Sequence, residues 1–272
     1  EAYYDKFVMH IDSSKLTEGT YLIKVNITKR FYENQTVIVM LKVEPIPTTL
    51  VWAKISSTSL EWGQVLEMNF TYIMWNGTPI IEATIMKCEI KGEEITYTIT
   101  LISLGNGTYL LRINTSDIAQ SPDLLGTYTM IVSLGKTHFV EQKATFALTI
   151  NPISTVDPTP IPPNVTLYWG EKVNITIEWR RLHGYVKIIN ATTNVTVLVE
   201  GVPITIPADA VTITEVDGIY TLLVDSSKLE DNVMYEISIK FEKPFYESKT
   251  CSVYVTVEPI PATAVLSTTE LK

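Results

Sequence analysis

Apolar and polar residues alternate along most of this chain with a period of two, which is the pattern of β-strands with one face buried. In residues 66–72, Leu, Met, Phe and Tyr alternate with Glu, Asn and Thr, and residues 173–179 repeat the pattern. Turn sequences containing glycine, such as 76–77, 105–107 and 217–218, separate these runs. We see no stretch with the period of an amphipathic helix. The pattern therefore predicts an all-β protein made of many short strands.

Parts of the sequence recur at fixed spacings. Residues 31–33, Phe-Tyr-Glu, recur 214 positions later, and Val43–Pro47 recurs as Val257–Pro261 at the same offset. Half of this spacing is also present, because Leu60–Gln64 resembles Leu167–Glu171 at an offset of 107. About seven strands in a repeat of this length are typical of an immunoglobulin-like (Ig-like) β-sandwich, with a barrel as the competing fold.

The repeat divides the chain into parts. We expect residues 1–47 to be the C-terminal part of an Ig-like domain and residues 48–153 and 164–261 to be complete domains. Residues 154–163 are rich in proline and are predicted to be a semi-rigid linker. Residues 262–272 are predicted to be the first strand of a following domain. The expected architecture is a set of tandem, Greek-key, Ig-like sandwiches in an elongated array.

The incomplete parts at the two ends bear on the length of the protein. Because residues 1–47 and 262–272 each match only part of a repeat, we expect the chain to be a segment of a longer repetitive protein. Pairing of residues 262–272 with a neighbouring chain by strand addition is the alternative.

Composition and charge exclude several classes of function. Hydrophobic residues make up 46% of the chain and charged residues 19%, so a packed core is expected. A net charge of −9 argues against binding to nucleic acid or to an anionic membrane. No run approaches the roughly 18 apolar residues of a membrane helix. The two cysteines, Cys88 and Cys251, fall in different repeats, so we expect free thiols buried in strands, with a disulfide between domains or chains as the alternative.

Asparagine is concentrated in acceptor motifs for N-linked glycans. At the chain's frequency of serine and threonine, chance would place about two of its 12 asparagines in an Asn-x-Ser/Thr motif. Ten asparagines lie in one: Asn26, Asn34, Asn69, Asn76, Asn106, Asn114, Asn164, Asn174, Asn190 and Asn194. A threonine-rich β-protein with incidental matches does not explain this excess. We therefore expect covalent N-glycans on an extracellular protein.

The spacing of the motif suits a strand. Residues i and i+2 of a strand share a face, so Asn and Thr both point outward while the apolar residue between them points inward. Asn26, Asn69, Asn164, Asn174 and Asn194 have this arrangement. The others, such as those at positions 76 and 106, lie at turns containing glycine. Glycans at these positions would leave the core closed.

We find no catalytic motif and expect no enzyme. There is no Gly-x-Ser-x-Gly, phosphate-binding loop or dinucleotide glycine pattern, and the three histidines lack the spacing of metal ligands. Asp12 and Asp225 belong to a repeated Asp-Ser-Ser-Lys-Leu motif that could bind Ca²⁺, but residues 114–118 replace it in the middle repeat. A turn in which Asp or Ser caps backbone amides is favoured there. Asp157 and Glu171, near the linker, are a weaker Ca²⁺ candidate.

Tryptophan occurs twice at one position of the repeat. Trp62 and Trp169 each precede a glycine at the start of a predicted strand. We expect them to be packing anchors between domains or at the end of a sandwich, with a carbohydrate-binding platform as the alternative.

The repeat, the Val-Glu-Pro-Ile-Pro strand ends and the ten acceptor motifs together resemble archaeal cell-surface proteins built from tandem Ig-like domains, such as surface-layer glycoproteins and filament-forming extracellular proteins. The resemblance covers the whole chain and is one of architecture and composition. It implies a structural protein of the cell surface that associates with itself in a lattice or filament and with neighbouring repeats of its own chain. The alternative is the stalk of an adhesin or receptor ectodomain that binds a partner elsewhere.

Overall fold

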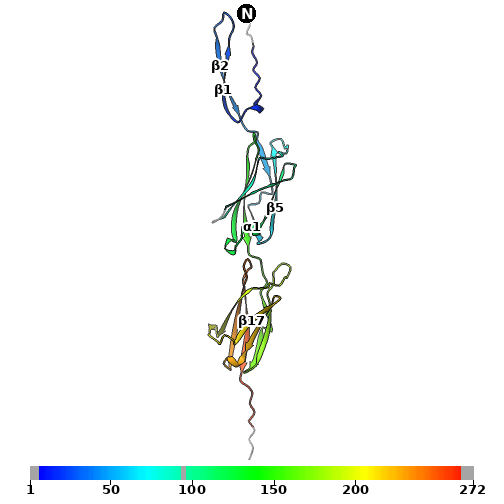
Figure 1. The fold of residues 1–272 in the computed structure, drawn as a ribbon, viewed down its shortest axis with the longest axis vertical. Coiled ribbons are helices and arrows are strands. Elements are labelled where there is room, and N and C mark those ends of the chain that lie inside the picture. The colour runs from blue at the N-terminus through cyan, green and yellow to red at the C-terminus, as the bar shows by residue number, and fades with distance from the viewer. Residues whose placement is uncertain (1–5, 93–95, 265–272) are drawn as a thin grey trace, which may run out of the picture. The chain divides into compact units, whose positions relative to one another are not determined.

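The computed structural model describes residues 6–92 and 96–264 (Figure 1). The described chain is built from strands, with one α-helical turn, α1 (Thr115–Ile118), and three 3₁₀ turns: η1 (Ser13–Lys15), η2 (Pro122–Leu124) and η3 (Ser226–Lys228). It divides into two compact units. One contains residues up to Ile118 and Gly126–Thr149, and the other contains Ala119–Leu125 and the residues from Ile150 onward.

The first unit contains a sandwich of two sheets, here called the middle sandwich. One sheet has the strand order β3 (Thr48–Val51), β5 (Val65–Met74), β9 (Thr108–Asn114), β8 (Ile102–Ser103). The other has the order β4 (Ser57–Glu61), β11 (Gln142–Asn151), β10 (Gly126–Gly135), β6 (Ile85–Lys91), β7 (Thr96–Thr100).

The second unit repeats this strand order, and its sheets form the C-terminal sandwich. One sheet is β12 (Thr159–Ile161), β14 (Lys172–Glu178), β18 (Ile219–Asp225), β17 (Val211–Val216). The other is β13 (Asn164–Tyr168), β20 (Lys249–Glu258), β19 (Val233–Glu242), β15 (Thr192–Val199), β16 (Val202–Pro203), with β13 parallel to β20. The prediction of tandem Ig-like β-sandwiches is confirmed.

Alternation along the strands builds the core of each sandwich. In β14, Ile175 and Ile177 are buried while Asn174 and Thr176 are exposed, as the period-2 pattern predicts. A buried tyrosine also ties a loop to the core of each sandwich. The hydroxyl of Tyr220 donates to the carbonyl of Ile188 (2.8 Å) and accepts the amide hydrogen of Ala191 (3.1 Å). Tyr109 makes the matching pair of bonds, of 2.8 and 3.0 Å, in the middle sandwich.

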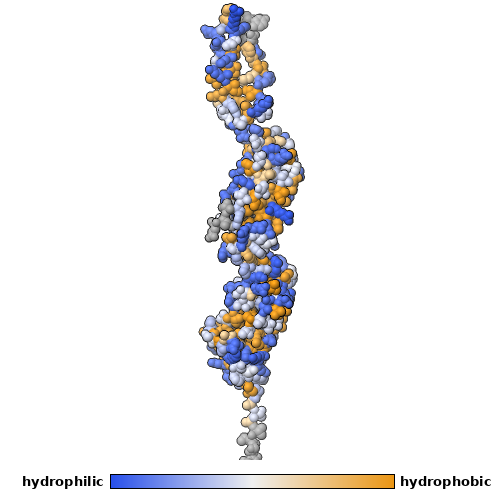
Figure 2. All heavy atoms as spheres, viewed as in Figure 1, coloured by the Kyte–Doolittle hydropathy of each residue, from blue (hydrophilic) through white to orange (hydrophobic). Residues whose placement is uncertain are grey.

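Residues 6–47 contain a hairpin of β1 (Gly19–Ile27) and β2 (Gln35–Val43), preceded by η1. The pairing of Gly19 with Val43 corresponds to that of Val233 with Val257 in β19 and β20, which η3 precedes. The inward residues of β19 and β20 are largely buried, whereas apolar residues of the hairpin are exposed (Figure 2). Val39, for example, is 37% exposed, whereas Val253, which lies 214 positions later in β20, is fully buried. On the other face of the hairpin, Leu22, Ile38 and Met40 are exposed as well.

The proline-rich segment predicted to be a linker contains a strand instead. Residues 159–161 form β12, which pairs antiparallel with β14 at the edge of its sheet. Proline has no backbone N–H to donate. At the edge of a sheet, one side of the strand has no neighbouring strand to accept that hydrogen bond, so Pro160 is tolerated there. Upstream, the hydroxyl of Thr155 donates to the carbonyl of Glu247 over 3.0 Å. This segment is therefore part of the C-terminal sandwich. Residues 262–272, predicted to be the first strand of a following domain, lie mostly outside the described residues.

Two further expectations concern cysteine and tryptophan. Cys88 is buried and Cys251 is half-buried, and neither forms a disulfide within the chain. Burial raises the pKa of the Cys88 thiol to about 12 and that of Cys251 to about 11, so both are weak nucleophiles. Trp169 is the second residue of a turn closed by the Glu171 amide and the Tyr168 carbonyl (3.0 Å) and is 45% exposed, whereas Trp62 is half-buried. The role of both as packing anchors stays a prediction.

Candidate glycosylation surface

The described structure places nine of the ten acceptor asparagines at exposed positions and one, Asn114, at a half-buried position. The strand-borne motifs have the predicted orientation. In β5, exposed Asn69 and half-buried Thr71 flank Phe70, which is fully buried. In β13, Asn164 and Thr166 are exposed and Val165 is half-buried between them. The acceptor nitrogens on these strands therefore face away from the core.

Three acceptors, Asn76, Asn106 and Asn114, share one local geometry. The side-chain carbonyl of Asn76 accepts the amide hydrogen of Thr78, and that of Asn106 accepts the amide hydrogen of Thr108, each over 3.1 Å. This Asx turn uses the oxygen of the side-chain amide and leaves the nitrogen, where a glycan would be attached, available. Asn114 has the same turn, but the residue after it, Thr115, is fully buried. Asn114 is therefore the least accessible of the ten.

Two acceptors make hydrogen bonds across strands. The side-chain oxygen of Asn26 accepts the hydroxyl hydrogen of Thr36, its cross-strand partner in the hairpin, over 3.0 Å. The side-chain nitrogen of Asn194 donates to the carboxylate of Glu242 over 3.1 Å. A glycan on Asn194 would remove one of the two hydrogens on this nitrogen, whereas a glycan on Asn26 would leave its bond in place.

The acceptors do not follow the repeat. None lies 107 or 214 positions from another, although strand ends and turns recur at these spacings. Inheritance of one motif from an ancestral repeat therefore does not explain their number. The ten are spread over β1, β5, β9, β13, β14, β15 and the loops between strands, and none lies after Asn194.

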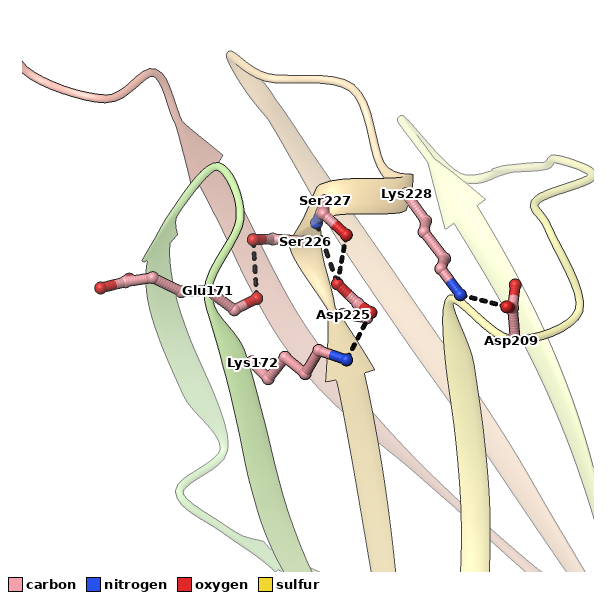
Figure 3. Close-up of polar contacts among 7 residues, drawn as sticks. All are labelled: Glu171, Lys172, Asp209, Asp225, Ser226, Ser227 and Lys228. Atoms are coloured by element: carbon pink, nitrogen blue, oxygen red, sulfur yellow. Dashed lines mark hydrogen bonds and ion pairs between the residues drawn. The ribbon is translucent and has the colours of Figure 1, made fainter.

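Figure 3 shows the repeated Asp-Ser-Ser-Lys motif at the end of β18. One carboxylate oxygen of Asp225 accepts the Ser227 amide (3.2 Å) and hydroxyl (2.6 Å), and the other lies 2.9 Å from the Lys172 ammonium nitrogen. The Ser226 hydroxyl lies within hydrogen-bond distance of the carbonyls of Glu171 (2.8 Å) and Tyr168 (2.9 Å). The motif thus caps η3 and fastens it to the turn before β14. The same carboxylate–amide bond caps η1, where Asp12 accepts the amide of Ser14.

In the middle sandwich, Thr115 takes the role that Ser226 has in the Asp-Ser-Ser-Lys motif, and the sequence did not reveal this. The hydroxyl of Thr115 lies 3.0 Å from the carbonyls of both Glu61 and Gln64, at the turn that corresponds to residues 168–171. A hydroxyl that follows the strand is the shared feature, and the change from Ser to Thr concealed it in the sequence.

The other residues considered for Ca²⁺ are not brought together. Asp157 pairs with Lys249 at 3.3 Å, and the carboxylate of Glu171 accepts the amide of Tyr168 at 2.8 Å. In residues 6–92 and 96–264, no group of three or more His, Cys, Asp or Glu side chains has the geometry of a metal site.

None of the helices in these ranges has the length and apolar character needed to cross a membrane.

Replacing Asp225 with alanine is expected to lower the urea midpoint of the C-terminal sandwich at pH 7 and to remove part of its acid sensitivity. The hydrogen bond from Ser227 and the ion pair with Lys172 lower the pKa of Asp225 to about 2. A depressed pKa adds stability above the unfolded value near 4, and this stability is lost as the pH falls toward 2. Urea titrations between pH 2 and 7, followed by hydrogen exchange in β18, measure both effects.

Asp217→Asn is the control for this experiment, because Asp217 lies in an exposed turn with a positive φ that asparagine also adopts. It should leave the midpoint and its pH dependence unchanged. A similar slope between pH 4 and 2 in Asp225→Ala and the unmodified chain would show that the capping carboxylate does not contribute.

Comparisons with known proteins concern the fold. No family model matches the chain, and no curated protein does. Among solved structures, a multidomain segment of titin is 10% identical with a TM-score of 0.38, covering 78% of this chain and 67% of that one. The Ig1-2 module of the Drosophila receptor protein tyrosine phosphatase DLAR is 14% identical (TM-score 0.25; 78% and 99%). Domains 4 and 5 of the S-layer protein SbsC are 18% identical (TM-score 0.28; 48% and 65%).

Proposed function

We propose that this chain is a repeat segment of a structural, N-glycosylated protein of an archaeal cell surface, within a surface layer or an extracellular filament. The observation that carries the proposal is the exposure of nine acceptor asparagines at positions unrelated by the repeat. A tandem of Ig-like sandwiches provides the scaffold, since each sandwich buries its own core and joins others through short connections. We assign no catalytic activity to it.

Glycans on this surface would act on solubility and on strand pairing. Asn164 lies on β13, the edge strand of its sheet, which offers unpaired backbone groups to other chains. A bulky hydrophilic group there would block uncontrolled edge pairing. Asn69 and Asn174 lie on β5 and β14, which are inner strands, so glycans there would cover the faces of sheets instead. Self-association would then use the surfaces that carry no acceptor.

Mass spectrometry of glycopeptides from the native protein tests the glycosylation. We expect glycans at exposed acceptors and the lowest occupancy at Asn114, because Thr115 beside it is fully buried. In a glycosylating archaeal host, Thr176→Ala should remove the glycan of Asn174, whereas Thr176→Ser should keep it, since the motif needs a hydroxyl at the third position. Unmodified asparagines at all ten acceptor motifs would contradict the proposal that the protein is N-glycosylated.

Electron micrographs of the purified native protein test the structural role. Ordered lattices or filaments are expected. A monodisperse monomer that binds a defined ligand would instead support the stalk of an adhesin or receptor ectodomain, the second function considered from the sequence.

A further inference from the structure

Two acceptor asparagines lie on equivalent inner strands, but at different positions of the repeat. The first residues of β5 and β14, at positions 65 and 172, are 107 positions apart. Asn174 of β14 therefore corresponds to Glu67 of β5, and Asn69 of β5 corresponds to Thr176 of β14. The acceptor differs by two residues along the strand between the two sandwiches, and a difference of two keeps it on the outer face of the sheet.

A leucine lies directly opposite the acceptor in both sandwiches. Asn69 pairs with Leu110 of β9, and Asn174 pairs with Leu223 of β18. Each leucine is half-buried between two residues of its strand that are fully buried, so it lies on the outer face beside the acceptor. Directly opposite side chains of an antiparallel pair have Cβ atoms about 4.5–5.5 Å apart, which is contact distance for a group attached to asparagine.

The leucine is absent from the equivalent position that carries no acceptor. Glu67 lies opposite Arg112, and the two form an ion pair of 3.0 Å. Thr176 lies opposite Thr221. Arginine and threonine at these places show that the sandwich itself does not require leucine there. The leucine therefore changes position together with the acceptor.

A second apolar residue lies on the other side of each acceptor, on the edge strand. In β12, Ile161 pairs with Thr176, and in β3, Val51 pairs with Thr71. Both threonines are the third residue of an acceptor motif, so Ile161 and Val51 are diagonal neighbours of the acceptors. Ile161 is 69% and Val51 is 49% exposed. Each acceptor is thus flanked by a leucine and by an exposed aliphatic side chain.

The outer face of the C-terminal sandwich is also hollowed next to its acceptor. A hollow of about 320 Å³, at the lower end of the volumes that hold small molecules, is lined by Ile161 and Thr176 among others. Glu178 and Arg180, which form an ion pair, line it as well. A pyranose ring has C–H groups on its faces and hydroxyl groups around its edge. An aliphatic surface with charged groups beside it matches both parts of such a ring.

We propose that the first sugar of each of these two glycans packs against the leucine opposite its acceptor and the aliphatic residue on the edge strand. These residues are Leu223 and Ile161 for Asn174, and Leu110 and Val51 for Asn69. The sugar removes apolar surface from water and stabilises the sandwich that carries it. The proposal rests on the proposed function and deepens it, because the glycans become part of the outer layer of the sheets.

A double-mutant cycle in the full chain, produced in a glycosylating archaeal host, tests the contact. Asn174→Gln removes the glycan, and Leu223→Thr introduces the residue type found at position 221. Hydrogen exchange of the most protected amides in β14 and β18 reports the opening of the C-terminal sandwich, with β5 and β9 as the internal reference. We expect loss of the glycan to speed this exchange about fivefold with leucine at 223 and less than about twofold with threonine. Intact mass selects the chains that carry the glycan.

Two controls separate the sugar from the substitutions. The same four chains from a host that adds no glycans should show no coupling between positions 174 and 223. Asn194→Gln removes a glycan whose cross-strand neighbours, Lys240, Glu242 and Ser238, are all polar. Loss of that glycan should change the exchange by less than about twofold.

Three results would overturn the proposal. A glycan on Asn174 that slows exchange equally with leucine and threonine at position 223 would overturn it and leave the glycoprotein role intact. Exchange that depends on protein concentration and not on the glycan would show that a second copy of the chain covers this face. Unmodified Asn69 and Asn174 in the native protein would also overturn it, whereas N-glycosylation as such fails only if all ten acceptors are unmodified.

Discussion

Replacing Trp179 with alanine is expected to lower the free energy of unfolding of the C-terminal sandwich by about 3–5 kcal/mol. Trp179 follows β14 and is fully buried. Its ring centroid lies 5.8 Å from that of Phe241 and 6.3 Å from that of Tyr246, so it fills the space between residues from different parts of the fold. Its removal leaves a cavity that these aromatic rings cannot close. Urea unfolding followed by hydrogen exchange in β14 and β19 measures the loss.

Trp75→Ala is the matched control, because Trp75 is 73% exposed and belongs to the other unit. It should change the stability of either sandwich by less than about 0.5 kcal/mol. If Trp179→Ala behaved like this control, the packing described for the core of the C-terminal sandwich would be wrong.

The inward position of Trp179 could be predicted from the sequence, because strand burial is a local property. Alternation places residues 173, 175, 177 and 179 on one face, and the structure buries the last three of these. The same reasoning placed Asn69, Asn164 and Asn174 outward. The ten acceptors could be found for a related reason, since their motif spans only three residues.

The partners of the proline-containing segments could not be predicted in this way. Ile46 contacts residues 138–140, and Ile153 contacts residues 245–247, more than 90 positions away in each case. Proline marks where a strand ends but carries no information about what the next residue touches. For the same reason residues 154–163 resembled a spacer, although Pro160 lies on an edge strand.

The sequence also did not reveal the backbone conformation of three recurring turns, residues 29–32, 136–139 and 243–246, in each of which the amide of the last residue donates to the carbonyl of the first. Phe31, His138 and Phe245 adopt a positive φ that glycine, asparagine and aspartate adopt most readily, so none of the usual turn signals marks them. Their common spacing of 107 positions was the available signal. A repeat can therefore reveal a strained turn where residue type does not.

Replacing Gly107 with alanine is expected to destabilise the middle sandwich by roughly 2–5 kcal/mol. Gly107 has a φ of +76°, and a residue with a side chain adopts this left-handed conformation at a cost of about 1–2 kcal/mol. A Cβ atom would also lie 2.6 Å from the Cβ of Pro79 and 3.2 Å from the amide nitrogen of Ile80, and overpacking of this kind adds about 1–3 kcal/mol. Because the crowding involves backbone atoms, rotation of a side chain cannot relieve it. Urea unfolding followed by hydrogen exchange in β5 and β9 measures the change.

Gly77 provides a control with the same local sequence. It has a φ of +84°, follows Asn76 and precedes Thr78, as Gly107 follows Asn106 and precedes Thr108, but its Cβ would meet nothing within 4 Å. Gly77→Ala should therefore lose only the conformational part, about 1–2 kcal/mol. Both substitutions keep an Asn-Ala-Thr acceptor motif, so glycosylation does not confound them. Equal losses of stability in the two variants would mean that Gly107 is required only for the conformation of its turn. In that case the loop that contains Pro79 would not pack against it.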